Sequence, residues 1–205
     1  MNPSDMWGTP PALADAIVAA LAERYGLHAG TTFMDPSCGK GAFPAALRRA
    51  GFFGMFANEI NISLCIDVIF RSDMPTTTSD ALEMDWHTDV TLTNPPFSRA
   101  LEFVAHCREM SPLVALVLPI GCLEPTKSAR KAYRNVGAGF YHELRTVYPF
   151  PRMEYIPLAN NGTDSNSGKR PDALYVWQRG YTGATEIDYA IARRLMGASA
   201  ECAAA

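Results

Sequence analysis

One run of apolar residues, Leu113–Leu118, limits the fold more than any other stretch of the chain. It has the length of a strand and no polar alternation, so it predicts a strand that is buried on both faces. Strands of this kind occur in parallel sheets that helices cover on each side. Segments with strand and helix patterns alternate along the rest of the chain, which favours such a sheet, with an antiparallel excursion near the end.

The periodicity and the Gly and Pro positions place the other elements. Strands are expected at 31–35, 53–57, 90–93, 142–147 and 172–178, with a further strand just before Asp80. Helices are expected at 12–25, 45–50, 63–70 and 126–135, with a further helix that begins at Ser98. The polar segment 160–168 is expected to be a mobile loop, and 203–205 a frayed tail.

Length and composition indicate one soluble globular domain over residues 1–205. The 205 residues are 48% hydrophobic and 19% charged, with no apolar run long enough to span a bilayer and no secretory signal at the start. The 5 cysteines and 4 histidines are scattered, without CxxC or HExxH spacing, so we expect neither a metal site nor disulfides. These features favour a cytoplasmic protein, and the net charge of −3 argues against indiscriminate nucleic-acid binding.

The stretch Asn94-Pro95-Pro96-Phe97 forms an unusual corner between an expected strand and an expected helix. The two prolines fix φ and remove two N–H donors, and Pro95 restricts Asn94 to an extended conformation. What remains is rich in acceptors, namely the Asn94 side-chain oxygen and the Pro95 carbonyl, with the flat ring of Phe97 beside them. Such a corner suits a planar amine that offers two hydrogens, although an ordinary Pro-Pro turn would have the same sequence.

Polar residues stand where the expected parallel strands end. Asp35, Glu59, Asp80 and Asn94 occupy these positions, and ligands of open parallel sheets bind beyond the carboxyl ends of the strands. Gly39 and Gly41 follow the first of these strands, where backbone can approach a ligand closely. Glu59 lies about twenty residues further on, at the spacing of a carboxylate that accepts ribose hydroxyls. Each carboxylate taken separately could be a solvated loop residue.

These motifs together resemble those of S-adenosylmethionine-dependent DNA adenine N6-methyltransferases. Residues 35–43, Asp-Pro-Ser-Cys-Gly-Lys-Gly-Ala-Phe, are similar to the cofactor loop of that family, and residues 94–97 to its catalytic motif. Trp7-Gly8-Thr9-Pro10 resembles the cofactor motif that comes first in the gamma order, and the short chain is similar to compact phage forms. The resemblance covers roughly residues 7 to 120. It implies a Rossmann-like class I methyltransferase fold, α/β, with a mostly parallel seven-stranded sheet and helices on both faces.

The resemblance also implies roles for the matching positions. S-adenosyl-L-methionine would be the cofactor, with Asp35, Gly39 and Gly41 at its methionine part, Glu59 at its ribose and Asp80 at its adenine. The full set of cofactor residues implied is Trp7, Thr9, Pro10, Asp35, Pro36, Cys38, Gly39, Gly41, Phe43, Glu59, Ile60, Asp80, Ala81 and Asn94. Lys40 departs from the family pattern, in which a small Ser is commoner, and would bring a cation near a sulfonium unless it points elsewhere.

The catalytic residues implied are Asn94, Pro95, Pro96 and Phe97. The Asn94 and Pro95 oxygens would bind the two amine hydrogens of an adenine flipped out of double-stranded DNA, and Phe97 would stack on the base. No covalent nucleophile is needed, so Cys38 is assigned to packing.

Basic residues are the candidates for nucleic-acid binding. Four of them cluster on one expected helix, namely Lys127, Arg130, Lys131 and Arg134. Three others, Arg152, Lys169 and Arg170, bracket the polar segment, which makes 151–171 a candidate target-recognition loop. A solvated helix face and an ordinary surface loop are the alternative interpretations.

Several other functions remain open from the sequence. The acceptor could be adenine in RNA, cytosine N4 or a protein glutamine amide, since all of these present planar amines. A catalytically silent methyltransferase-like DNA-binding protein is a further alternative, and the protein could be a monomer or a homodimer. A nicotinamide dehydrogenase is disfavoured, because the loop lacks the full GxGxxG pattern and the Asn-Pro-Pro-Phe corner would have no role.

Overall fold

The computed structural model describes residues 7–65, 68, 75–124, 138–158 and 171–200. Within these residues, no helix is both long and apolar enough to cross a membrane. The expected helix at 126–135, the polar loop at 160–168 and the tail at 203–205 lie outside the described residues.

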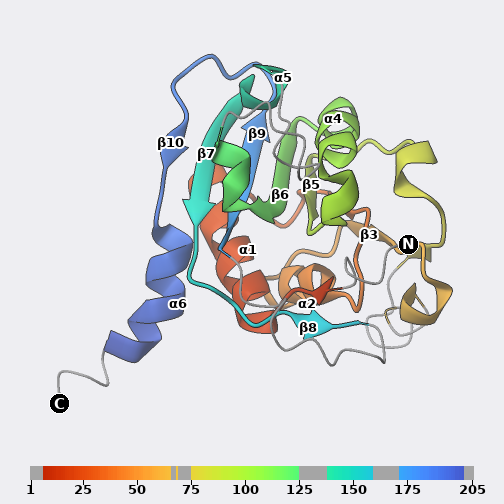
Figure 1. The fold of residues 1–205 in the computed structure, drawn as a ribbon. Coiled ribbons are helices and arrows are strands. Elements are labelled where there is room, and N and C mark those ends of the chain that lie inside the picture. Colours follow the sequence, from red (N-terminus) through yellow and green to blue (C-terminus); the bar gives the residue numbers. More distant parts are fainter. Residues whose placement is uncertain (1–6, 66–67, 69–74, 125–137, 159–170, 201–205) are drawn as a thin grey trace.

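A large mixed sheet forms the centre of the molecule (Figure 1). Its strands lie in the order β10 (Glu186–Ile187), β7 (Leu144–Pro149), β9 (Asp172–Gln178), β6 (Leu113–Pro119), β5 (Val90–Thr93), β2 (Phe33–Asp35), β3 (Met55–Asn58) and β4 (Thr76–Thr77). Only β9 runs antiparallel to its neighbours among these described strands. The expected mostly parallel sheet with a late antiparallel excursion is therefore confirmed, and the short edge strand β10 is added to the seven strands that were expected.

The apolar run at 113–118 becomes β6, whose seven residues are all buried. Alternate residues enter two separate cores: Leu113, Ala115 and Val117 face one, while Val114, Leu116 and Leu118 face the other. The strand β9 pairs with β6 along its whole length and is divided between the cores in the same way. Burial on both faces explains why neither strand carries the polar alternation of a half-exposed strand.

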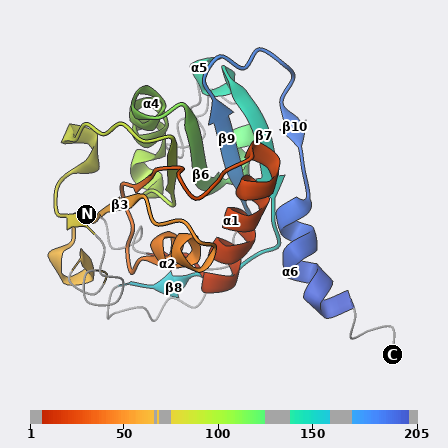
Figure 2. The ribbon, with the colours of Figure 1, turned by 180° about the vertical axis from the view of Figure 1, so that it is seen from behind.

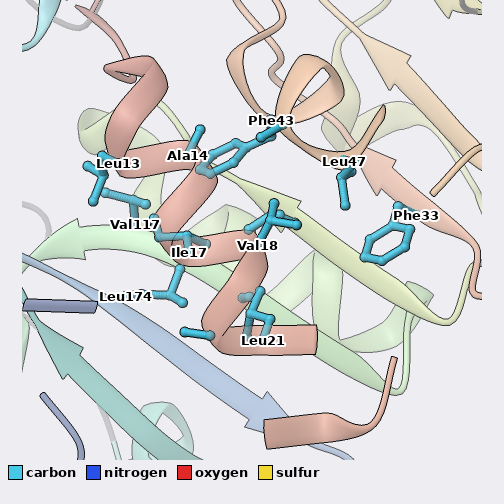
Figure 3. Close-up of a cluster of buried hydrophobic side chains, with 14 of the residues drawn as sticks. Leu13, Ala14, Ile17, Val18, Leu21, Phe33, Phe43, Leu47, Val117 and Leu174 are labelled. Atoms are coloured by element: carbon cyan, nitrogen blue, oxygen red, sulfur yellow. The ribbon is translucent and has the colours of Figure 1, made fainter. Parts of the chain in front are cut away.

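Helices cover both faces of the sheet. The first core is formed against α1 (Pro11–Tyr25), α2 (Ala42–Arg49) and α6 (Ala190–Ala200), and the second against α4 (Ala100–Met110) and α5 (Ala138–Tyr141). In Figure 2, seen from behind, α1 and α6 lie side by side. Figure 3 shows α1 directing Leu13, Ile17 and Leu21 toward the sheet residues Val117 and Leu174.

Most element boundaries fall close to those expected. The helix α1 begins at Pro11 and ends before Gly26, which adopts the left-handed conformation at φ 61°. The helix α2 begins at Ala42, three residues earlier than expected, because Gly41 at φ 78° turns the chain directly into it. The helix α6 was not expected from the sequence. Of the expected helix 63–70, only residues 63–65 and 68 are described, and all of them are helical.

A separate two-stranded ribbon joins segments that are far apart in the chain. Its strands are β1 (Trp7–Gly8) and β8 (Ile156–Pro157), which pair antiparallel. The expected loop at 151–171 thus contains a strand in its first part, and residues 159–170 lie outside the described residues. Whether this segment recognises a target stays a prediction.

The packing of α1 leads to a stability prediction. Ile17 is fully buried between α1 and the sheet, so Ile17→Ala should leave a cavity and lower the free energy of unfolding by about 2–5 kcal/mol. Met196, which is 59% exposed on α6, provides the control, since Met196→Ala should change this free energy by no more than about 0.5 kcal/mol. Urea unfolding measures both values, and equal stabilities of the two variants would contradict the packing described.

Candidate active site at the carboxyl ends of the strands

A cavity of about 360 Å³ lies at the edge of the sheet where β2, β3, β4 and β5 end. Parallel pairing brings the carboxyl ends of these strands to one edge, and the four polar residues expected there all line the cavity: Asp35, Glu59, Asp80 and Asn94. These residues are far apart in the sequence, and the order of the strands in the sheet brings them together.

The β1–β8 ribbon and the residue after it, Leu158, lie against this cavity. Leu158 packs so closely that a Cβ on Gly39 would meet its Cδ1 at 3.1 Å, and a Cβ on Gly8 would meet its Cδ2 at 2.9 Å. At Gly39 the positive φ of 54° favours glycine in any case, whereas a side chain at Gly8 would require Leu158 to shift. Leu158 was not among the expected site residues, because nothing in the sequence around it indicates that the ribbon folds against the loop after β2.

The loop after β2 is tied to the end of β3. Gly39, at φ 54°, donates its N–H to Glu59 Oε2 at 2.8 Å, and the Cys38 N–H donates to the Asn58 carbonyl at 3.0 Å. Glu59 Oε1 accepts from the Asn61 N–H at 2.9 Å. Burial raises the pKa of Glu59, and each of its oxygens can still accept a further hydrogen bond, for example from a hydroxyl.

Asp35, the last residue of β2, is 3% exposed. Its Oδ1 accepts from the Ser37 N–H at 3.3 Å, but its buried Oδ2 has no hydrogen-bond partner. Burial raises the pKa of Asp35 to about 7. A buried carboxylate oxygen without a partner, at the wall of a cavity, is suited to a cationic ligand group such as an ammonium, because the cation would offset the cost of burying the charge.

Asp80 lies between β4 and the short helix η2 (Ala81–Glu83). Its Oδ1 accepts from the Leu82 N–H at 3.1 Å, and its Oδ2 accepts from Arg99 Nη1 at 2.8 Å. The hydrogen bond from Arg99 holds the pKa of Asp80 below its ordinary value. Arg99 also lines the cavity and was not expected from the sequence, although a cation five residues after Asn94 was a signal that could have been followed.

Asn94, directly after β5, is held by contacts on two sides. Its Nδ2 donates to Thr9 Oγ1 at 3.2 Å, and its carbonyl accepts from Ser37 Oγ at 3.4 Å. Ser37 Oγ in turn shares a hydrogen bond of 2.7 Å with Thr93 Oγ1. Because the amide nitrogen is engaged by Thr9, the side-chain oxygen of Asn94 is left as the acceptor for a ligand.

The other motif residues are divided between the cavity and the core. Pro96 lines the cavity with Asn94, whereas Pro95 and Phe97 do not. Phe97 begins the short helix η3 (Phe97–Arg99), is 7% exposed and packs in the second core. Its role as a stacking surface stays a prediction.

The structure brings most of the expected cofactor residues together. All of them line the cavity except Pro10 and Gly41, and Gly41 lies instead at a neighbouring hollow of about 310 Å³. Lys40, which is exposed, also lines that hollow and not the main cavity.

Of the seven basic residues expected at nucleic acid, only Arg152 is described, and it is exposed. The others lie outside the described residues, so their role stays a prediction: Lys127, Arg130, Lys131, Arg134, Lys169 and Arg170. In the part of the chain that the structure describes, no group of His, Cys, Asp and Glu side chains could hold a metal ion.

Comparisons with known proteins identify the fold. No protein-family model and no curated protein sequence matches the chain. Among solved structures, it is similar to the methyltransferase subunit of a type I restriction-modification system from Streptococcus thermophilus, with a TM-score of 0.68 and 16% identity over 96% of this chain and 53% of that one. It thus spans about half the length of that subunit.

Two further structures have similar overall size. A putative RNA methyltransferase from Pyrococcus horikoshii matches with a TM-score of 0.62 and 16% identity, over 80% of this chain and 82% of that one. Magnesium protoporphyrin IX methyltransferase from Synechocystis with bound SAM matches with a TM-score of 0.56 and 14% identity, over 82% and 79% of the two chains. At these identities the likeness establishes the fold, which is the class I methyltransferase Rossmann-like fold.

The buried Asp35 leads to a prediction about pH. At a pH below the pKa of Asp in the unfolded chain, about 3.9, Asp35 is protonated in both the folded and the unfolded protein. Between that value and about 7 only the unfolded chain ionises, so this residue lowers the stability of the ligand-free protein as pH rises. Asp35→Asn should therefore leave stability unchanged at pH 3.5 and increase it by about 2–4 kcal/mol at pH 8.

Denaturant unfolding at the two pH values measures this difference. Asp15→Asn is the control, because that carboxylate lies at the surface in an ion pair with Arg49 and should contribute about 1 kcal/mol or less. A gain for Asp35→Asn of the same size at both pH values would mean that the charge of Asp35 is not responsible.

Proposed function

We propose that this protein transfers the methyl group of S-adenosyl-L-methionine to the N6 amine of adenine in DNA, after the base has been flipped out of the duplex. The observation that carries the proposal is the arrangement at Asn94, where the amide nitrogen is engaged by Thr9 and the side-chain oxygen is left at a cavity lined by carboxylates.

The residues of the cavity fit the cofactor. Asp35 Oδ2, buried and without a partner, suits the ammonium of the methionine part. Glu59 can accept from ribose hydroxyls with both oxygens, and Asp80 can accept from an adenine amine. Bound there, the cofactor would supply a methyl group made electrophilic by its sulfonium.

The chain's own part in the reaction is to prepare the amine. An adenine amine is a weak nucleophile because its lone pair is delocalised into the ring. The Asn94 side-chain oxygen would accept one of its hydrogens and the Pro95 carbonyl the other, which would favour a pyramidal nitrogen. Pro95 is buried and does not line the cavity, so its part in the proposal requires that its carbonyl become accessible to the amine. Positive charge develops on that nitrogen during transfer, so these oxygens stabilise the transition state more than the ground state.

Contacts around Asn94 hold this acceptor in place before a substrate arrives. Thr9 fixes the side-chain amide, while Ser37 and Thr93 fix the backbone carbonyl. A group held in advance does not have to reorganise during the reaction, which is how such dipoles become effective. Stacking of the flipped base on Phe97 remains part of the proposal, and it requires access to a ring that is now largely buried.

DNA is proposed as the acceptor because the motif order resembles that of DNA methyltransferases and because the similar Streptococcus thermophilus structure is a restriction-modification methyltransferase subunit. The similar Pyrococcus horikoshii structure is a putative RNA methyltransferase of comparable length, so adenine in RNA is the second candidate.

One experiment separates the acceptors. The purified protein is incubated with methyl-labelled cofactor and double-stranded DNA, single-stranded DNA, structured RNA or protein, and the labelled product is digested and identified. N6-methyladenine in DNA supports the proposal. Label found in RNA, on cytosine N4 or in protein would instead identify that group as the acceptor and overturn the proposal. Cofactor binding without transfer to any of the four would instead support a silent binding protein.

Replacement of Asn94 tests the catalytic assignment. Asn94→Ala removes one of the two acceptors and should lower the rate of methyl transfer by about 10²–10³-fold, while the Kd for the cofactor changes little. Asn94→Asp keeps an acceptor oxygen at this position and should retain more activity than Asn94→Ala. Unchanged turnover in Asn94→Ala would remove Asn94 from the mechanism.

The contact between Thr9 and Asn94 gives a separate prediction. Thr9→Val has nearly the same shape but cannot hydrogen-bond to the amide, so kcat should fall by roughly tenfold. Thr9→Ser keeps the hydroxyl and should restore most of kcat. Because Thr9 also lines the cavity, cofactor affinity is measured by calorimetry in both variants, so that a change in kcat is separated from weaker cofactor binding. An equal loss of kcat in Thr9→Val and Thr9→Ser would indicate a packing role for Thr9.

A further inference from the structure

An ion pair stands at one side of the cavity, between the element that follows β4 and the one that follows β5. Arg99 Nη1 donates to Asp80 Oδ2 at 2.8 Å, and both residues line the cavity. Their side chains are 37% and 28% exposed, so the pair is accessible to a ligand without being fully solvated.

Arg99 is held from a second side by α4. Its Nε and Nη2 donate to Glu102 Oε2 at 3.2 and 3.1 Å. A guanidinium carries five N–H groups in one plane, so further N–H groups of Arg99 remain for a ligand after these contacts are counted. Two carboxylates from different elements thus fix the plane of the guanidinium beside Asp80.

Asp80 is correspondingly prepared as an acceptor. The hydrogen bond from Arg99 lowers the pKa of Asp80, so the carboxylate stays ionised to a lower pH than an ordinary aspartate. Its two oxygens contact Leu82 N–H and Arg99, and each oxygen can accept one more hydrogen bond. The pair therefore presents a fixed acceptor next to a fixed donor.

We infer that Arg99 is a specificity-determining residue, which together with Asp80 selects a 6-aminopurine nucleoside as the cofactor's base. This inference rests on the proposed cofactor but not on the identity of the methyl acceptor. Adenine offers an amine donor beside a ring-nitrogen acceptor, which complements the Asp80 oxygen and the Arg99 N–H. Hypoxanthine offers a carbonyl acceptor beside an N–H donor, which is the reverse pattern.

Removal of Arg99 has two effects on this recognition. The donor is lost, and Asp80 is no longer held in one orientation by a partner. A site built from paired polar groups discriminates strongly against a ligand that leaves them unpaired. The variant should therefore lose affinity for the adenosyl ligand, and lose most of its preference over the inosyl analogue.

Calorimetric titration tests this with two ligands, S-adenosylhomocysteine and S-inosylhomocysteine. We expect the wild-type protein to prefer the adenosyl compound by about 100-fold. Arg99→Met should bind the adenosyl compound roughly tenfold more weakly and prefer it by less than about tenfold. Arg193→Met is the control, since Arg193 is also paired with an aspartate but lies on α6, away from the cavity, and should behave like the wild type.

The outcomes are distinguishable. An Arg99→Met variant with wild-type affinities for both ligands, or with higher affinity for the adenosyl compound, overturns the role of Arg99. A wild-type protein that binds neither compound overturns the proposed cofactor. If circular dichroism shows that Arg99→Met is unfolded, Arg99→Lys decides: it keeps the charge but not the planar fork, and a preference equal to that of the wild type would overturn the inference.

Discussion

The parallel pairing of β2 with β3 and β5 is the interaction on which the rest of the site depends. It places Asp35, Glu59 and Asn94 at one edge of the sheet, although 59 positions separate the first from the last. The hydrogen bond from Gly39 to Glu59 then closes the loop of β2 onto the end of β3. A change of register by one residue would turn these side chains to the other face and leave the cavity without its polar wall.

Burial of the Asp35 carboxyl group in this site lowers the free energy of unfolding at pH values where the unfolded chain is ionised. Asp35 is held in the wall of the cavity with one oxygen unpaired, which opposes its ionisation in the absence of a ligand. The surrounding cores can support this cost because β6 and β9 are buried on both faces. Asp80 is the opposite case, because Arg99 favours its charged form. Two carboxylates of one cavity, at the ends of β2 and β4, are thus suited to different ligand groups, Asp35 to a cation and Asp80 to a neutral donor.

The sequence alone was sufficient to predict the sheet and the polar strand ends, because their signals are local. An apolar run such as 113–118 and a polar residue after each strand can be recognised without knowing their neighbours. The β1–β8 ribbon could not be predicted, since two strands of two residues have no periodicity and their pairing joins positions about 150 residues apart. Arg99 and Leu158 enter the cavity only through such long-range packing. The burial of Phe97 was missed for the same reason, because its core neighbours come from several different elements.

The β1–β8 ribbon connects the wall of the cavity with the side chain of Asn94. Thr9 follows directly after β1, whose two residues pair with β8, while Leu158 follows β8 and lies within van der Waals reach of the loop after β2. Thr9 is at the same time the hydrogen-bond partner of the Asn94 amide. The same ribbon therefore closes one wall of the cavity and anchors the Asn94 amide, so a substitution that displaces the ribbon would disturb both at once.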